Sequence, residues 1–496
     1  MRINKVTLRF WAISIVLVLL AASLYSVIFQ ASDPFKAPAK KITAKSLQDF
    51  YSQEINWQDC YSEFQCAKYQ VPIDYDNLEL GTFDIAVLKR PTASAIGNLV
   101  INPGGPGGSG VDYAYSYQQA FTTEVIENYN IVGFDPRGVS RSAPIECLSN
   151  AETDEAYAAD AYPENDSDIA KLQRQSKEYA QSCVKDNEFL KFYGTVNAAR
   201  DMDILRELLG DKDLNYLGKS YGTFLATLYA QLFPENVGRF VLDGAVDPTL
   251  DSQSQALQQA IGFDQAFNAF ATDCNLDKSC AFESDATAEM KTWLAELKKS
   301  PLKVGNRELT ESLAVYGIAM GLYDKDLGWP SLRKALKDLV NQDGKALLDM
   351  ADAYTGRNSD GEYRGNEIDA LAVISCNDFP PSAIDANEVK LAAPLFGKYV
   401  AYGDLTCNYF PRAKVFTINN KIQLTKSVLV IGTTNDPATP YRWAVRLSEV
   451  LVNSRLISLD SDGHTGYNRG SDCVDQAVEA YLILGEDPAE NLSCNA

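Results

Sequence analysis

Histidine is almost absent from this sequence, because His464 is the only one among 496 residues. A cluster of histidine ligands for a metal ion is therefore excluded, and no Cys-x-x-Cys pair offers a substitute. Positive charge is also scarce, with 45 Lys and Arg against 66 Asp and Glu and a formal net charge of −21. Because an acidic surface repels phosphate backbones, we expect no nucleic-acid partner.

Charged residues are missing from one N-terminal stretch, residues 10–29, which follows Arg2, Lys5 and Arg9. This is the layout of a secretory signal, and its length also suits a membrane anchor. We expect residues 1–32 to be a signal peptide or an anchor through residues 10–29, and residues 33–50 to be a linker. The protein is then secreted or exposed at the cell surface.

The chain has ten cysteines, an even number, and export would place them where disulfides persist. Pairing each cysteine with its neighbour in sequence would close five short to medium loops. Spacing alone leaves the connectivity open. The cysteines are Cys60, Cys66, Cys147, Cys183, Cys274, Cys280, Cys376, Cys407, Cys473 and Cys494.

Short apolar runs alternate with helical patterns over much of the chain. Several runs, such as IVGF, RFVL and SVLVI, are apolar at every position, which is typical of strands buried on both faces of a parallel sheet. The alternation predicts an α/β fold with a doubly wound, mostly parallel sheet. The predicted strands are 69–73, 83–88, 98–101, 129–134, 214–217, 239–242, 427–431 and 456–459; helices are predicted at 198–209, 221–232 and 441–451.

The alternation stops near Pro248, and mostly helical patterns follow to about residue 384. We interpret residues 248–385 as a helical lid inserted into the fold, with residues 51–247 and 386–496 forming the two parts of the core. Helices are predicted within it at 252–271, 286–299, 309–322, 331–339 and 344–354.

The motif Gly-x-Ser-x-Gly occurs at Gly218–Gly222, between a predicted strand and a predicted helix. That context makes Ser220 a candidate nucleophile on a sharp turn, with the amides of the following helix directed at developing negative charge. The alternative is an incidental Gly-Ser turn. A serine hydroxyl needs a base, and His464 is the only histidine that could serve, although a lone histidine is often purely structural.

The acid of such a triad has more than one candidate. Asp436 follows the SVLVI strand, and a loop at the carboxyl end of a strand is where a residue that orients the histidine belongs. Asp243, in VLDG, is the main rival, and Asp462 is too close in sequence to His464 to be favoured. Thr439 could support Asp436 through its hydroxyl, or act only in a turn or helix cap.

Residues 102–110, NPGGPGGSG, contain five glycines directly after a predicted strand. A nucleotide-binding loop is disfavoured, because neither glycine-rich phosphate-binding pattern is matched. We expect an oxyanion loop in which Gly104 or Gly105 donates one backbone N–H and Tyr221 donates the other. The nearby Asp135 and Arg137, in GFDPRG, are interpreted as structural.

In combination, NPGGPGGSG, GFDPRGVSRS, GKSYGT, ISCNDFP, GTTNDPATPYRWA and SDGHTGY resemble the secreted tripeptidyl aminopeptidases. That group is related to the proline iminopeptidases, in peptidase family S33 of the α/β hydrolases. The resemblance implies an α/β-hydrolase fold, the triad Ser220, Asp436 and His464, and cleavage near the N-terminus of peptides.

The expected activity is therefore that of a serine exopeptidase that needs no metal or organic cofactor and acts on peptides with a free N-terminus. Such an enzyme must recognise the α-amino group, and Asp378 is a candidate for that contact. A structural role for Asp378, in a loop held by Cys376, is the alternative. Two other functions stay open: a carboxylesterase or lipase with the same triad, and a non-catalytic binding protein on a hydrolase scaffold.

Overall fold

The computed structural model describes residues 34–160, 162–382 and 386–495. Residues 1–32, predicted to be the export signal or anchor, lie outside this part of the chain. Among the helices of the described residues, none combines the length and apolar character needed to cross a membrane.

One sheet of ten strands forms the core, in the order β1-β2-β3-β5-β4-β6-β7-β10-β11-β12. Strands β5 to β12 of this order pair in parallel, whereas β1, β2 and β3 are antiparallel to their neighbours. This is the α/β-hydrolase type of sheet that the sequence predicts. The strands are β1 (Gln58–Cys60), β2 (Phe64–Pro72), β3 (Thr82–Arg90), β4 (Asn98–Asn102), β5 (Asn130–Phe134), β6 (Leu214–Lys219), β7 (Val237–Asp243), β10 (Ile422–Asn435), β11 (Leu451–Asp462) and β12 (Leu492–Asn495).

Helices cover both faces of the sheet, which explains the uninterrupted apolar runs. In β10, Val428 and Val430 join the core cluster on one face, while Leu429 and Ile431 join the cluster on the other. Successive strand residues point to opposite faces, so both sets must be apolar when both faces are covered. The helices of the core are α2 (Leu47–Tyr51), α3 (Gly110–Tyr115), α4 (Tyr117–Ala120), α5 (Thr123–Asn128), α8 (Thr195–Leu208), α9 (Tyr221–Leu232), α18 (Tyr441–Val450) and α19 (Asp472–Glu479).

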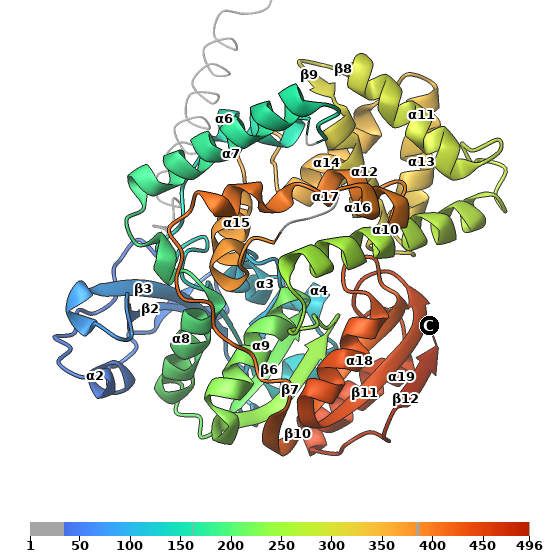
Figure 1. The fold of residues 1–496 in the computed structure, drawn as a ribbon. Helices are drawn as coiled ribbons and strands as arrows, with labels where there is room; N and C mark the ends of the chain where they lie inside the picture. Colours follow the sequence, from blue (N-terminus) through green and yellow to red (C-terminus); the bar gives the residue numbers. More distant parts are fainter. Residues whose placement is uncertain (1–33, 161, 383–385, 496) are drawn as a thin grey trace, which may run out of the picture.

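A separate set of helices gathers beyond the long helix α10 (Ser252–Cys274), at the top of Figure 1. The apolar side chains of most of these helices form a hydrophobic cluster of their own, whereas the buried side chains of α15 (Glu367–Asp378) join the core cluster of the sheet. We call this set the helical insertion. It contains α11 (Ala286–Lys299), α12 (Glu311–Leu322), α13 (Gly328–Val340), α14 (Lys345–Thr355), α15 (Glu367–Asp378), α16 (Ala386–Ala392) and α17 (Gly397–Val400), with the small hairpin β8 (Leu302–Val304) and β9 (Arg307–Leu309).

The helical region differs from the predicted insertion at both ends. It does not close at residue 385, because α16, α17 and the 3-10 turn η4 (Gly403–Asn408) precede the return of the sheet at β10. Two helices in the predicted N-terminal core, α6 (Asn150–Ala158) and α7 (Asp166–Asp186), also lie beside it (Figure 1). Tyr157 of α6 contacts the rings of Tyr316 and Tyr363 in the insertion.

The predicted linker 33–50 is not a free spacer in its described part. Phe35 and Ala39 are buried, and the Ala39 N–H donates to the Asp84 carboxylate at 2.9 Å. The last residues of the predicted linker already belong to α2. This segment therefore packs against the core.

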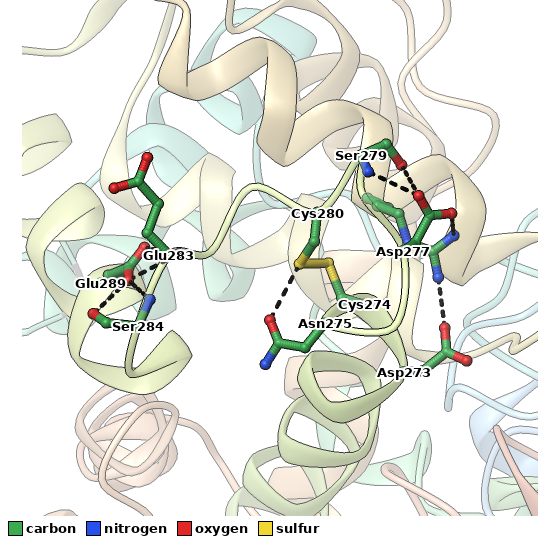
Figure 2. The surroundings of a disulfide bond; sticks show 10 residues. Asp273, Cys274, Asn275, Asp277, Ser279, Cys280, Glu283, Ser284 and Glu289 are labelled. Atoms are coloured by element: carbon green, nitrogen blue, oxygen red, sulfur yellow. Dashed lines mark hydrogen bonds and ion pairs between the residues drawn. A yellow bond between two sulfur atoms is a disulfide. The ribbon is translucent and has the colours of Figure 1, made fainter.

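All ten cysteines form disulfides, each with its neighbour in sequence, as the simplest pairing predicts. Figure 2 shows Cys274–Cys280, which closes the turn after α10; Arg333 of α13 forms ion pairs with Asp273 and Asp277 beside it. Five disulfides indicate an oxidising compartment outside the cytoplasm. The pairs are Cys60–Cys66, Cys147–Cys183, Cys274–Cys280, Cys376–Cys407 and Cys473–Cys494.

Candidate active site

Ser220 is held on the sharp turn between β6 and α9. Its backbone has φ +54° and ψ −124°, in a region that non-glycine residues rarely occupy, and it is anchored by a 2.8 Å hydrogen bond from its N–H to the Asp243 carbonyl. The turn is so tight that a Cβ on Gly218 would lie 2.7 Å from the Gly222 carbonyl oxygen. The two motif glycines therefore permit the turn that presents the Ser220 side chain.

His464 and Asp436 meet at the carboxyl edge of the sheet. They follow β11 and β10, which are parallel neighbours, so the loops after them leave the sheet at the same edge. The imidazole Nδ1 lies 2.9 Å from each carboxylate oxygen of Asp436. This contact leaves Nε2 as the ring nitrogen that can exchange a proton with a hydroxyl.

The Asp436 carboxylate is buried and fully engaged. It accepts hydrogen bonds from the N–H groups of Ala438, Thr439 and Thr465, and from the Thr439 hydroxyl at 2.9 Å. These donors hold the carboxylate in its position beside the imidazole ring. Thr439 therefore contacts the acid directly, in addition to its place before α18.

Asp243, the rival acid, does not contact the imidazole nitrogen through a hydrogen bond. Its carboxylate accepts from the N–H groups of Gly466 at 2.8 Å and Tyr467 at 3.0 Å, and Lys219 lies 3.8 Å away. Burial raises the pKa of Asp243, and these partners oppose the rise. Asp243 therefore anchors the loop that follows His464.

The helical insertion also holds the His464 loop. The backbone N–H of His464 donates to the Tyr323 carbonyl at 2.9 Å, and the Tyr323 ring stands edge-on to the imidazole with centroids 5.2 Å apart. An ion pair of 2.7 Å between Lys325 and Asp462 adds to this contact. The sequence offers no pattern from which Tyr323 could have been identified.

Ser220 and His464 border the same backbone segment, but no hydrogen bond joins them within the described part of the chain. The Asp243 carbonyl binds the Ser220 N–H, and a Cβ on the next residue, Gly244, would lie only 3.1 Å from His464 Cε1. Catalytic hydrogen bonds are often long in unliganded sites and tighten when substrate binds.

The glycine-rich loop lies directly against the Ser220 turn. A Cβ on Gly104 would lie 2.9 Å from Ser220 Cβ and 3.3 Å from the Tyr221 nitrogen. The Gly104 N–H, however, donates to the Asn102 side chain at 3.0 Å, so it is not the free donor that was one of the two predicted options. Gly105 and Tyr221 line the cavity beside Ser220, and Tyr221 opens α9, where first-turn amides have no partner inside the helix.

Asp135 supports this loop from within the core, whereas Arg137 anchors the segment that follows β5. Asp135 accepts hydrogen bonds from the Ser109 hydroxyl and the Val111 N–H at the start of α3. Arg137 is completely buried, forms a two-point contact with Asp201, and donates to backbone carbonyls. Neither side chain lines the cavity beside Ser220.

A cavity of about 250 Å³ adjoins Ser220, between the core and the helical insertion. Its walls include Tyr221 and Thr439, and two carboxylates from the other side, Asp378 and Asp404. No Lys or Arg lines it among the described residues. The structure thus places the predicted Asp378 in the cavity that adjoins Ser220, and adds Asp404, for which the sequence carried no signal. No group of acidic or Cys and His side chains suited to a metal ion occurs among the described residues.

The Thr195 hydroxyl links Asp378 to Tyr221, the residue after Ser220. The Thr195 N–H donates to Asp378 at 2.8 Å, and the Thr195 hydroxyl contacts both the Asp378 carboxylate and the Tyr221 hydroxyl. Exclusion of water by the surrounding protein raises the pKa of Asp378 to about 7, against the opposing effect of Thr195. The charge of this carboxyl therefore changes near neutral pH.

The sequence of this chain is similar to those of known hydrolases. Residues 393–494 match the family described as TAP-like protein. Serine protease Hip1 of Mycobacterium tuberculosis (strain H37Rv) is 35% identical over 486 residues, covering 91% of this chain and 93% of that protein. Carboxylesterase B of the same organism is 35% identical over 455 residues, covering 87% and 86%.

Tripeptidyl aminopeptidase of Streptomyces lividans is 31% identical over 475 residues, covering 89% of this chain and 86% of that protein. These relatives are similar to the chain over nearly all of its length, including the sheet and the helical insertion. The chain therefore belongs to the family of TAP-like α/β hydrolases that includes the tripeptidyl aminopeptidases, and it is a serine hydrolase.

Proposed function

We propose that this serine hydrolase is an exported exopeptidase that removes short peptides or single residues from the free N-termini of peptides. The proposal rests on the cavity beside Ser220. Asp378 and Asp404 line this cavity, and no Lys or Arg side chain lines it among the described residues. A protonated α-amino group has the charge and the hydrogen-bond donors to match two carboxylates. An ester substrate without an amine would leave both carboxylates without a cationic partner.

In the proposed mechanism, His464 takes the proton of the Ser220 hydroxyl as the oxygen attacks the scissile carbonyl. Asp436 holds the imidazole through Nδ1 and stabilises its charged form. The N–H groups of Gly105 and Tyr221 bind the oxyanion. His464 then protonates the leaving amine, and water hydrolyses the acyl-enzyme to regenerate Ser220.

The size of the cavity limits how much of the substrate lies before the scissile bond. A volume of about 250 Å³ is below the range of about 300–1,000 Å³ typical of sites for drug-sized ligands. A short N-terminal segment fits such a space, and a folded or long one does not. Asp378 and Asp404 then bind the amine and set the distance from the N-terminus to the cut.

A carboxylesterase with the same triad is the second candidate, favoured by the similarity to carboxylesterase B and by apolar walls such as Phe224, Leu371 and Trp443. The two functions differ in their need for a free amine. We also propose that residues 1–32 direct the export of the chain. They are either removed as a signal peptide or kept as a membrane anchor through residues 10–29.

The test is mass spectrometry of the products from matched free and N-acetylated peptides. We expect wild-type enzyme to release N-terminal fragments from the free peptide with a kcat/KM at least about tenfold higher, because a hydrogen bond to a charged group is worth about 1.5–3 kcal/mol. Ser220→Ala should cleave neither peptide. Equal cleavage of both peptides would reject amine recognition, and hydrolysis of esters alone would favour the carboxylesterase.

A further inference from the structure

A second cavity, of about 640 Å³, reaches His464 but not Ser220. Its walls come from the core at Pro103, Tyr113 and Lys219, and from the helical insertion at Met320 and Met350. The first cavity has the converse relation, because it is lined by Ser220 and not by His464. The two cavities therefore adjoin different members of the triad.

The chemistry of acyl transfer indicates which part of the substrate each cavity would bind. The acyl part of the substrate becomes bonded to Ser220, whereas the leaving amine takes its proton from His464. The leaving segment must therefore lie on the side from which the imidazole is reached. That side opens into the second cavity, and the acidic cavity is left for the N-terminal, acyl part.

The walls of the second cavity are suited to an extended peptide with an apolar side chain. Leu327 is 75% exposed and Met320 is 38% exposed, although both are large and apolar. The Tyr113 hydroxyl is buried in the wall and has no hydrogen-bond partner among the described residues. A buried hydroxyl without a partner is costly, and a peptide carbonyl or N–H group would supply the missing bond.

The position of this cavity is fixed relative to His464. Tyr323 lies in its wall and accepts the His464 N–H at 2.9 Å. Asp324, also in the wall, forms an ion pair of 2.9 Å with Arg469 of the His464 loop. The insertion and the histidine loop therefore form one continuous wall.

We propose that the second cavity binds the polypeptide segment on the carboxyl side of the scissile bond, and that it prefers an apolar side chain next to the cut. This inference rests on the proposed peptidase function. It assigns the acidic cavity to the N-terminal residues that are released and the second cavity to the remainder of the peptide.

The test compares three substrates with the same first three residues and a free amine. Two are peptides that continue with Leu-Leu or with Asp-Asp, and the third is the tripeptide methyl ester, whose leaving group needs no subsite. Mass spectrometry first locates the cut in each peptide. We expect wild-type enzyme to prefer the Leu-Leu peptide over the Asp-Asp peptide by roughly tenfold in kcat/KM, the scale of one apolar contact in a pocket.

The variants Met320→Glu and Leu327→Glu should lower the ratio of kcat/KM between the Leu-Leu peptide and the methyl ester by about tenfold. Leu276→Glu is the matched control, since Leu276 is 86% exposed and lies outside the cavity walls. The control should keep the wild-type ratio.

This inference would be overturned if the Leu-Leu and Asp-Asp peptides were cut equally well. It would also be overturned if the ratio of kcat/KM between the Leu-Leu peptide and the methyl ester changed as much in Leu276→Glu. Either result would leave the proposed peptidase function standing. Failure of wild-type enzyme to cleave any free-amine peptide while it hydrolyses the ester would instead reject the proposed function, and the inference with it.

Discussion

Nδ1 of His464 lies 2.9 Å from both carboxylate oxygens of Asp436. A buried carboxylate in this position orients the ring, selects the tautomer with a free Nε2, and stabilises the imidazolium. The other buried candidate, Asp243, binds backbone N–H groups of the same loop. The two aspartates therefore differ in what their loss should change.

Replacing Asp436 with Asn should lower kcat by about 10⁴-fold, because the amide favours the wrong tautomer of His464. The measurement is kcat on a free-amine peptide together with the melting temperature. Asp243→Asn is the comparison, and it should mainly lower the melting temperature. A larger loss of kcat in Asp243→Asn than in Asp436→Asn would reverse the assignment.

Gly104→Ala should lower kcat by about 100- to 1,000-fold, the usual effect of losing one oxyanion donor, because it displaces the neighbouring donor Gly105. The residue has φ +106°, and its new Cβ would lie 2.8 Å from the Lys219 carbonyl oxygen, so the loop must move away from Ser220. Gly210→Ala is the matched control, because Gly210 also has a positive φ, +77°, but nothing lies within 4 Å. The control should keep its kcat, and similar kcat values in both variants would argue against the oxyanion loop.

The preference for a free amine should depend on pH through Asp378, whose pKa burial raises to about 7. Below that pH the carboxyl is neutral and binds an ammonium group weakly; above it the carboxylate is charged, until the peptide amine itself deprotonates near pH 8. The ratio of kcat/KM for free over N-acetylated peptide should therefore rise from about pH 6 to about pH 7.5 and fall again above about pH 8.

Taking this ratio cancels any effect of pH that is common to the two substrates. In Asp378→Asn the rise below pH 7.5 should disappear, and the ratio should be lower by about tenfold. An unchanged profile in that variant would show that Asp378 does not bind the amine. Asp404→Asn tests the second carboxylate in the same assay.

The Cys376–Cys407 disulfide joins the end of α15, which carries Asp378, to η4, which carries Asp404. Replacing both cysteines with Ser should therefore weaken the preference for a free amine, by about tenfold in the same ratio of kcat/KM. The matched control is the double Ser variant at Cys60 and Cys66, on the antiparallel edge of the sheet. If the two variants prefer the free-amine peptide equally, the Cys376–Cys407 disulfide has no specific role in substrate recognition.

Sequence reasoning was most successful where a residue follows a strand. The SVLVI run placed Asp436 after β10, the motif placed Ser220 between β6 and α9, and the eight predicted strands all lie in the one sheet. Parallel strands put the loops that follow them at a common edge, so linear order carries spatial information there. The missed strands β1, β8, β9 and β12 have three or four residues each, too few for a periodic signal.

The contacts made by the helical insertion could not be predicted in the same way. Asp404 reaches the cavity from a 3-10 turn, and Tyr323 reaches His464 from the residue after α12. Both positions depend on how helices pack, and that of Asp404 also depends on the Cys376–Cys407 disulfide. Neither position follows from a repeat in the sequence. The acidic character of the cavity beside Ser220 became visible only when the structure placed Asp378 and Asp404 together.

The role of Ser220 as the nucleophile is tested most directly by active-site labelling with a fluorophosphonate, followed by peptide mapping. We expect a single adduct on Ser220, its absence in Ser220→Ala, and strongly slowed labelling in a folded His464→Ala variant, because the hydroxyl then has no base. An adduct on another residue, or equal labelling of wild type and Ser220→Ala, would contradict this role.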